Sequence, residues 1–198
     1  GGNKGGTPQD PIKMGNFSFP TGWNHAVYPY RSQSTGKFYV FAGDEASRTS
    51  TRYSPITERG TGTPGYQGEP SHWRGWIHIL EWSDSETSKI VARYEVPEAG
   101  SHNIWIEDDV MYVAFYNGGL RIVDISGELM GNLYRQGREI ARFLPFDPEG
   151  FVPNAPQVWG AQPHKGNIFF SDYNSGLWVV RLSEHDTESV ENLNHSKP

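Results

Sequence analysis

One stretch of this sequence occurs twice, and the repetition constrains the fold more than any other feature of the chain. "VMYVAFYNGGLRIVDIS" spans residues 110–126, and "NIFFSDYNSGLWVVRLS" spans residues 167–183. In both copies a Tyr-Asn turn joins two runs rich in β-branched and aromatic residues, which predicts a pair of antiparallel strands. Because one such unit is too small to bury its own apolar faces, several copies must stack against one another.

A third copy lies earlier in the chain, where "IHILEWS" at residues 77–83 aligns with "LRIVDIS" and "LWVVRLS". Each copy also has a run before this one, at residues 37–45, 110–117 and 167–174, and a first run that begins at His25, His102 and Pro156. Two further runs, at residues 89–97 and 138–145, follow the first two copies. The sequence therefore predicts four strands in each full copy.

Four short antiparallel strands that recur every roughly 40 to 60 residues are typical of a β-propeller blade. Repeated hairpins of a β-sandwich are the alternative, but a sandwich gives no reason for whole four-strand sets to recur in one order. We therefore predict an all-β fold, a partial β-propeller with two complete blades and one incomplete blade. The expected parts are a Gly-rich linker (1–11), an outer strand (12–20), a blade (25–97) with a long loop (46–74), a second blade (102–145), an incomplete blade (155–183) and a polar tail (184–198).

The number of copies is smaller than the four to eight blades of ordinary propellers. Residues 12–20, "IKMGNFSFP", resemble a fourth strand without a blade before it. This strand either completes the last blade of the same chain or ends a blade that lies upstream. We expect the missing blades to come from upstream sequence or from another subunit, because an open row of blades exposes unpaired edges and an apolar flank.

"GGLRIVDIS" and "SGLWVVRLS" resemble the LVIVD repeat, which occurs in β-propellers of bacterial and archaeal surface or secreted proteins. The resemblance implies a propeller used for protein interaction and a location outside the cytoplasm, whether periplasmic, at the cell surface or secreted. It brings no catalytic residues to this chain and no cofactor.

The composition narrows the choice of partners. The net charge is -6 and the basic residues do not cluster, which argues against binding to nucleic acid or to an anionic membrane surface. No apolar run is long enough for a transmembrane segment. The chain has no cysteine, so neither a disulfide nor a thiolate metal site is expected.

His25 and His102 begin the first strand of their copies, and first strands lie nearest the central channel of a propeller. One hypothesis is that the two imidazoles hold a metal ion in a channel enzyme. The alternative is that each histidine makes a hydrogen bond within or between blades, as buried polar groups require. The spacing of the two residues matches no known metal motif and favours the structural role.

Three aromatic residues in the long loop, Tyr53, Tyr66 and Trp73, are candidates for partner binding, since exposed aromatic rings give large contact areas. They could equally belong to a carbohydrate-binding propeller. Asp108 and Asp109 are interpreted as turn residues and Asp124 as a hydrogen-bonding group between blades. The leading prediction is a non-catalytic binding module, a scaffold or accessory subunit of an extracytoplasmic assembly.

Overall fold

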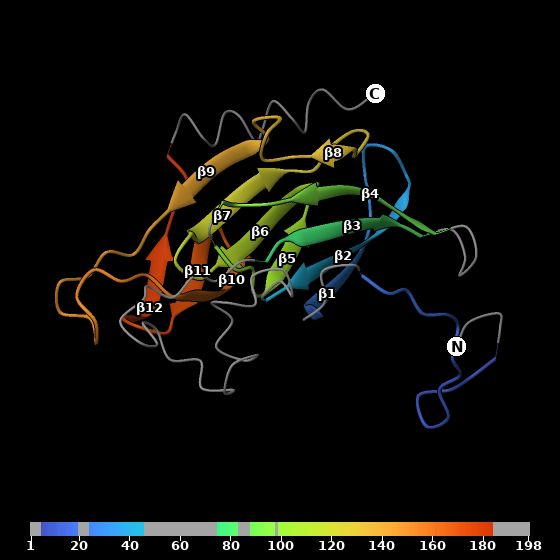
Figure 1. Cartoon of the computed structure of the whole chain (residues 1–198), viewed down its shortest axis with the longest axis horizontal. Coiled ribbons are helices and arrows are strands. Elements are labelled where there is room, and N and C mark those ends of the chain that lie inside the picture. The colour runs from blue at the N-terminus through green and yellow to red at the C-terminus, as the bar shows by residue number, and fades with distance from the viewer. Residues whose placement is uncertain (1–4, 20–23, 46–74, 83–87, 98, 184–198) are drawn as a thin grey trace.

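The structure is a computed structural model that describes residues 5–19, 24–45, 75–82, 88–97 and 99–183. Within these residues it contains β-strands and no helix, and its twelve strands form three separate sheets. The prediction of an all-β protein built from several antiparallel sheets is therefore confirmed. The sheets lie side by side in the order of the sequence (Figure 1).

The N-terminal sheet is the largest of the three, with the strand order β1-β2-β3-β4-β8. Its strands are β1 (Asn24–Arg31), β2 (Phe38–Asp44), β3 (Ile77–Glu81), β4 (Lys89–Tyr94) and β8 (Gly131–Asn132). The first four are antiparallel neighbours in chain order, as the repeat predicts. The short β8 is an addition from much later in the chain, and it pairs in parallel with β4.

The other two sheets follow the same plan. The middle sheet contains β5 (Ile104–Glu107), β6 (Val110–Phe115), β7 (Gly119–Asp124) and β9 (Glu139–Phe143), and the C-terminal sheet contains β10 (Val158–His164), β11 (Asn167–Asp172) and β12 (Gly176–Val180). Apart from β8, each strand overlaps a run that the repeats predict. In the described residues no fourth strand joins β12.

Two apolar clusters hold the three sheets together, one on each face of the middle sheet. Met111, Val113 and Phe115 of β6 point into the first cluster, which the N-terminal sheet shares. Val110 and Ala114 point into the second, which the C-terminal sheet shares. Successive residues of a strand point to opposite faces, so β6 is buried on both sides.

The turn between β5 and β6 joins the first two sheets. Asp108 and Asp109 have φ values of 53° and 57°, the left-handed conformation that a tight hairpin turn requires. The Asp109 carboxylate accepts hydrogen bonds from the backbone N–H groups of Gln33 (2.9 Å) and Ser34 (2.8 Å) in the turn that follows β1. The sequence predicts Asp109 as a residue that bonds within its own turn, whereas its carboxylate binds the neighbouring sheet.

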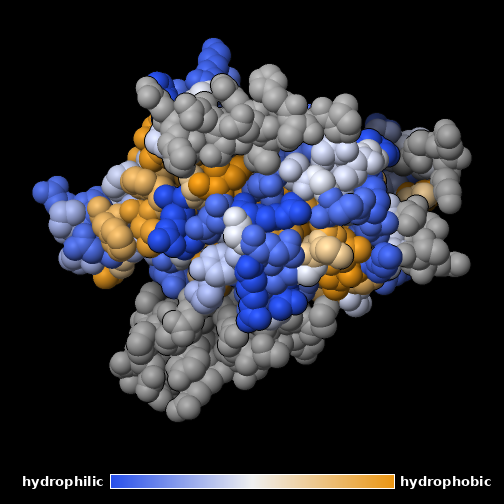
Figure 2. Space-filling model, turned by 90° about the horizontal axis from the view of Figure 1, so that it is seen from above, coloured by the Kyte–Doolittle hydropathy of each residue, from blue (hydrophilic) through white to orange (hydrophobic). Residues whose placement is uncertain are grey.

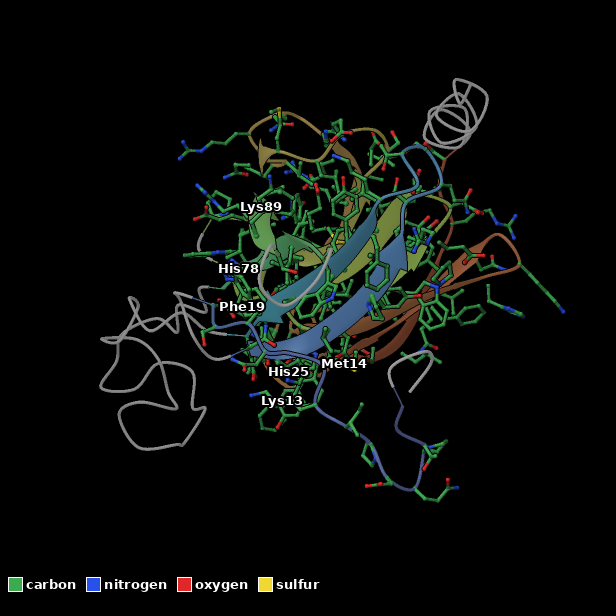
Figure 3. All side chains as sticks on the ribbon, turned by 90° about the vertical axis from the view of Figure 1, so that its right-hand side faces the viewer. Lys13, Met14, Phe19, His25, His78 and Lys89 are labelled. Atoms are coloured by element: carbon green, nitrogen blue, oxygen red, sulfur yellow. The ribbon has the colours of Figure 1, made fainter. Side chains whose placement is uncertain are left out.

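Two further predictions from the sequence differ from the structure. Asp124, expected to bond between blades, accepts a hydrogen bond from the N–H of Ser126 two residues away, so it stabilises its own turn. Residues 12–19 form no strand, so the outer strand expected at 12–20 is not formed in its described part. Instead, the ring of Phe19 stacks on His78 of β3, with ring centroids 4.9 Å apart (Figure 3).

Candidate functional site

The first strands of the three sheets begin at equivalent positions. In β1 and β10 a register shift separates Asn24 from Ala26 and Val158 from Gly160, which places His25 and Trp159 at matching bulges. His102 lies just before β5. Its N–H donates to the carbonyl of Ala114 in β6, and the N–H of Ala114 donates to Asn103, so two residues face one and His102 takes the same bulged position. Three ring-bearing residues therefore occupy one equivalent position in three successive sheets.

These rings form a continuous stack across the sheets, which we call the ring stack (His25, His102, Trp159 and Tyr173). The ring centroids of His25 and His102 lie 4.1 Å apart, and those of His102 and Trp159 lie 5.2 Å apart. Tyr173, which follows β11, stacks on Trp159 at 4.9 Å. The stack is buried in its middle and open at its end, because His102 is 8% exposed and Tyr173 is 73% exposed.

Polar contacts fix the two histidines. His102 donates through Nδ1 to the backbone oxygen of Trp159 (2.7 Å), and His25 Nδ1 lies 3.9 Å from the Glu45 carboxylate. Burial, and then the nearby His25, lower the pKa of His102, so this imidazole stays neutral near pH 7. Tyr116 donates a hydrogen bond to Glu45, and burial together with this carboxylate raises the pKa of the phenol.

The structure thus brings His25 and His102 together, as the metal hypothesis requires, but packs their rings against each other at an interplanar angle of 36°. In the part of the chain that the structure describes, no group of three or more His, Asp or Glu side chains is placed to hold a metal ion. The hydrogen bond from His102 Nδ1 to Trp159 is the contact between blades that the alternative hypothesis predicts. Metal binding at His25 and His102 stays a prediction.

Sequence comparison misplaced one member of the stack. The alignment of the first strands from His25, His102 and Pro156 puts Trp159 level with Tyr28 and Trp105, whereas the strand pairing places it level with the histidines, three residues away. The third copy has no histidine to mark this position, so the aromatic residue at the fourth position of each run set the alignment. Gly160 is a local signal of the irregularity beside Trp159, since glycine inside a strand often accompanies a bulge.

The three aromatic residues predicted to bind a partner, Tyr53, Tyr66 and Trp73, lie outside the described residues. The same holds for the rest of the long loop, 46–74. Partner binding and carbohydrate binding by this loop therefore stay predictions.

A second loop, between β9 and β10, lies at the left end of the molecule in Figure 1. It exposes several apolar side chains to solvent. Phe146 is 58% exposed, Phe151 92% and Val152 50%. Asn174 holds the loop from the neighbouring turn: its side-chain oxygen accepts from Val152 N–H (2.7 Å), and its Nδ2 donates to the Val152 carbonyl (2.8 Å). We call residues 146–154 the apolar loop.

The apolar loop is also braced internally. The backbone carbonyl of Asp147 accepts hydrogen bonds from the N–H groups of Gly150 and Asn154. The Asp147 carboxylate accepts a further hydrogen bond from the backbone N–H of Glu149 (2.8 Å). These bonds fix the loop while its large side chains remain in water. Full burial of a Phe side chain stabilises by about 1.5–3 kcal/mol, so the exposure of Phe151 leaves that gain unused in the free chain.

The outward side of the C-terminal sheet is a second apolar surface, which we call the trailing face (Phe169, Leu177 and Val179). Pairing of the strands makes Leu177 and Val179 equivalent to Leu120 and Ile122 of the middle sheet. Leu120 and Ile122 are 0% and 2% exposed, but Leu177 and Val179 are 74% and 51% exposed. In the space-filling view, hydrophobic residues lie toward this end of the molecule and also in a second area right of centre (Figure 2).

The chain is an all-β protein of repeated antiparallel sheets, and comparison with known families matches one of the repeats to a family that suggests a β-propeller-type module. The model of the LVIVD repeat matches residues 100–128, which contain β5, β6 and β7. The resemblance inferred from the sequence is therefore confirmed for the middle repeat. No curated protein matches the chain.

The described residues include no helix long and apolar enough to cross a membrane.

Proposed function

We propose that this protein is a non-catalytic β-propeller module that binds a protein partner as a scaffold or accessory subunit of an extracytoplasmic assembly. The observation that supports this most is the apolar loop, which holds Phe151 almost fully in solvent on a hydrogen-bonded support. The location outside the cytoplasm is supported by the LVIVD resemblance alone, and fractionation of the native cells tests it directly.

An ordered loop with exposed aromatic tips suits protein binding for two reasons. Binding loses less conformational entropy when the loop already holds one conformation. Large side chains that enter a pocket on the partner supply most of the binding energy of an interface. The carboxylates of Asp147 and Glu149 beside the tip favour a partner whose pocket is bordered by Lys or Arg side chains.

The experiment compares partners recovered with the wild-type chain, Phe151→Ser and Met130→Ser. Met130 is a matched control, because it is 66% exposed in a different loop. After chemical cross-linking in native cells, quantitative mass spectrometry should find one protein that falls about tenfold or more with Phe151→Ser and is unchanged with Met130→Ser. Equal recovery with all three forms contradicts the proposal.

The metal-dependent enzyme is the second candidate, and the approach of His25 to His102 with Glu45 nearby is the observation in its favour. Imidazole nitrogen is a common zinc ligand, but these three side chains are not placed to hold one ion together, so a metal here would need a further ligand or a movement of the side chains. Elemental analysis of the purified chain decides between the two. A stoichiometric transition metal that is lost when both histidines are changed to Ala supports the enzyme, and substoichiometric metal in both forms removes it.

A further inference from the structure

We propose that a cavity between the middle and C-terminal sheets binds a zwitterion of the size of a dipeptide. The ammonium group of the ligand lies at the turn between β5 and β6, and its carboxylate lies at the turn between β10 and β11. The cavity has a volume of about 660 Å³, which is within the usual range for ligand sites. Both sheets lie within the described residues, so the proposal needs no free end of the chain. It does not depend on the partner proposed for the apolar loop.

The junction between the N-terminal and middle sheets shows how this position is closed elsewhere in the molecule. There the turn formed by residues 32–37 reaches across to the turn between β5 and β6. The Asp109 carboxylate accepts hydrogen bonds from the backbone N–H groups of Gln33 (2.9 Å) and Ser34 (2.8 Å). These bonds join the two turns and close the first junction at this end.

Both halves of that bridge are missing from the second junction. Strand pairing makes Gly166 the equivalent of Asp109, so the C-terminal sheet has no carboxylate at this place. The turn of the middle sheet is residues 108–109, which is much shorter than its counterpart at residues 32–37. A Cβ added to Gly166 would meet no atom within 4 Å, and Gly166 lines the cavity. The cavity therefore lies where the first junction has its bridge.

The two turns that border the cavity carry opposite charges. Glu107 and Asp108 line it from the middle sheet, and Lys165 lines it from the C-terminal sheet. All three side chains are exposed, and in the part of the chain that the structure describes none of them forms an ion pair. Complementary charges favour one orientation of a bound molecule. A ligand with a charge of each sign matches both turns at once.

The basic side of the cavity is held by hydrogen bonds. The Arg181 guanidinium, which also lines the cavity, donates through Nε (3.3 Å) and Nη2 (3.0 Å) to the side-chain oxygen of Asn167. The Asn167 amide in turn donates to the backbone carbonyl of Lys165 (3.4 Å). Binding costs less conformational entropy when such groups are already ordered.

The wall between the two turns is largely apolar. Val110 and Ile168 are almost fully buried and line the cavity together with the half-buried Tyr112 and Leu182. Burial, and then the charges of the two nearby carboxylates, raise the pKa of Tyr112, so the acidic groups lie close to the phenol. Apolar walls with a few charged groups are typical of sites for small molecules. We therefore expect a dipeptide with an apolar side chain.

The first test is a titration with glycyl-leucine, followed by NMR at the amides of Lys165, Gly166 and Asn167. Saturable shifts in the millimolar range are expected. The N-acetylated dipeptide lacks the ammonium group and the dipeptide amide lacks the carboxylate, so each should bind about three- to tenfold more weakly. No saturation up to about 10 mM, or equal binding of the three compounds, overturns the proposal.

The second test assigns the two ends of the ligand. Glu107→Gln should lower the preference for glycyl-leucine over its N-acetylated form, and Lys165→Gln should lower the preference over its amide. Each variant should leave the other preference unchanged. Glu149→Gln and Lys89→Gln are matched controls, because both side chains are exposed and neither lines the cavity, and they should keep both preferences.

The comparison of the three compounds separates a role of the charges from a change in the fold. A variant that weakens all three compounds equally, or one that alters the wrong preference, overturns the assignment of the two turns. Recovery of a protein partner with Phe151→Ser is a separate measurement, so failure here leaves the proposed function untouched.

Discussion

Asp109 is the residue that most directly ties the first two sheets together. Its carboxylate accepts hydrogen bonds from two backbone N–H groups of the turn after β1. Its own backbone N–H donates to the hydroxyl oxygen of Tyr30 (2.8 Å). Ser34, in the same turn, accepts from the N–H of Gly127 on the other side of β7 (2.8 Å). One short turn of the N-terminal sheet is thus held at two points by the middle sheet.

We predict that Asp109→Asn lowers the free energy of unfolding by about 1–2 kcal/mol, because one of the two part-buried N–H groups loses its acceptor. Asn tolerates the left-handed backbone at this position, so the change tests the carboxylate alone. Asp108→Asn is the matched control, since Asp108 bonds only to the exposed Gln33 side chain, and it should cost under about 0.5 kcal/mol. Urea unfolding at pH 7 measures both, and equal values contradict the role given to Asp109.

The same carboxylate makes stability depend on pH. Burial raises the pKa of Asp109, but hydrogen bonds from Ser34, Gln33 and Tyr30 outweigh it and leave the pKa below its ordinary value. A lowered folded-state pKa stabilises the protein fully above about pH 4, and this contribution is lost as the pH falls through the folded value. Unfolding followed from pH 6 to pH 2 should show a steeper loss for the wild type than for Asp109→Asn. Parallel curves would mean that Asp109 is not the group responsible.

At the scale of single elements, the apolar loop depends on close packing between Gly150 and Asn174. A Cβ at Gly150 would lie 2.6 Å from Nδ2 of Asn174. The Asn side chain can move away, but it then gives up its two bonds to Val152. Gly150 does not have a positive φ, so it is the contact with Asn174, and not the backbone conformation, that requires glycine at this position.

We predict that Gly150→Ala releases the apolar loop without unfolding the sheet beneath it. Loss of a hydrogen bond worth about 1.4 kcal/mol speeds local amide exchange by about tenfold. Hydrogen exchange followed by NMR should show this increase at Val152, while the amides of Ile168 and Phe170 in β11 keep their rates. A uniform increase across β11 would show that the loop is part of the sheet's cooperative unit.

The elements differ in how well the sequence predicts them. The strands follow from runs rich in β-branched and aromatic residues and from Tyr-Asn turns, which are local signals in the sequence. β8 could not be predicted, because only two residues form it and their partner β4 lies far away in the chain. The ring stack could be predicted only in part: the shared position of His25 and His102 is visible in the sequence, but Trp159 replaces the histidine in the third copy, and only the strand pairing shows that it takes the same position.

For the whole molecule, the three sheets differ in how far they are covered. The residues of β7 are buried with the exception of its half-buried last residue, whereas three of the five residues of β12 are exposed. Local openings cost less where fewer apolar contacts are lost. The C-terminal sheet should therefore be the least stable of the three in a single chain.

We predict that amides of β11 and β12 exchange faster than those of β6 and β7, because fewer apolar contacts are lost when the C-terminal sheet opens. Native-state hydrogen exchange followed by NMR measures both sets of rates. Equal protection of the two sheets would contradict the prediction.

The parallel strand β8 separates the unit that is repeated in the sequence from the unit that folds in space. Gly131 and Asn132 belong to the connection between β7 and β9 of the middle copy, yet they complete the N-terminal sheet, and the next residue, Leu133, is fully buried in the core between the two. A gene rearrangement that copied or removed one repeat at its sequence boundary would therefore leave its neighbour without a strand. A new copy would fold only if it came with the neighbouring copy that shares a strand with it. The number of sheets should therefore change less readily in evolution than the surface side chains.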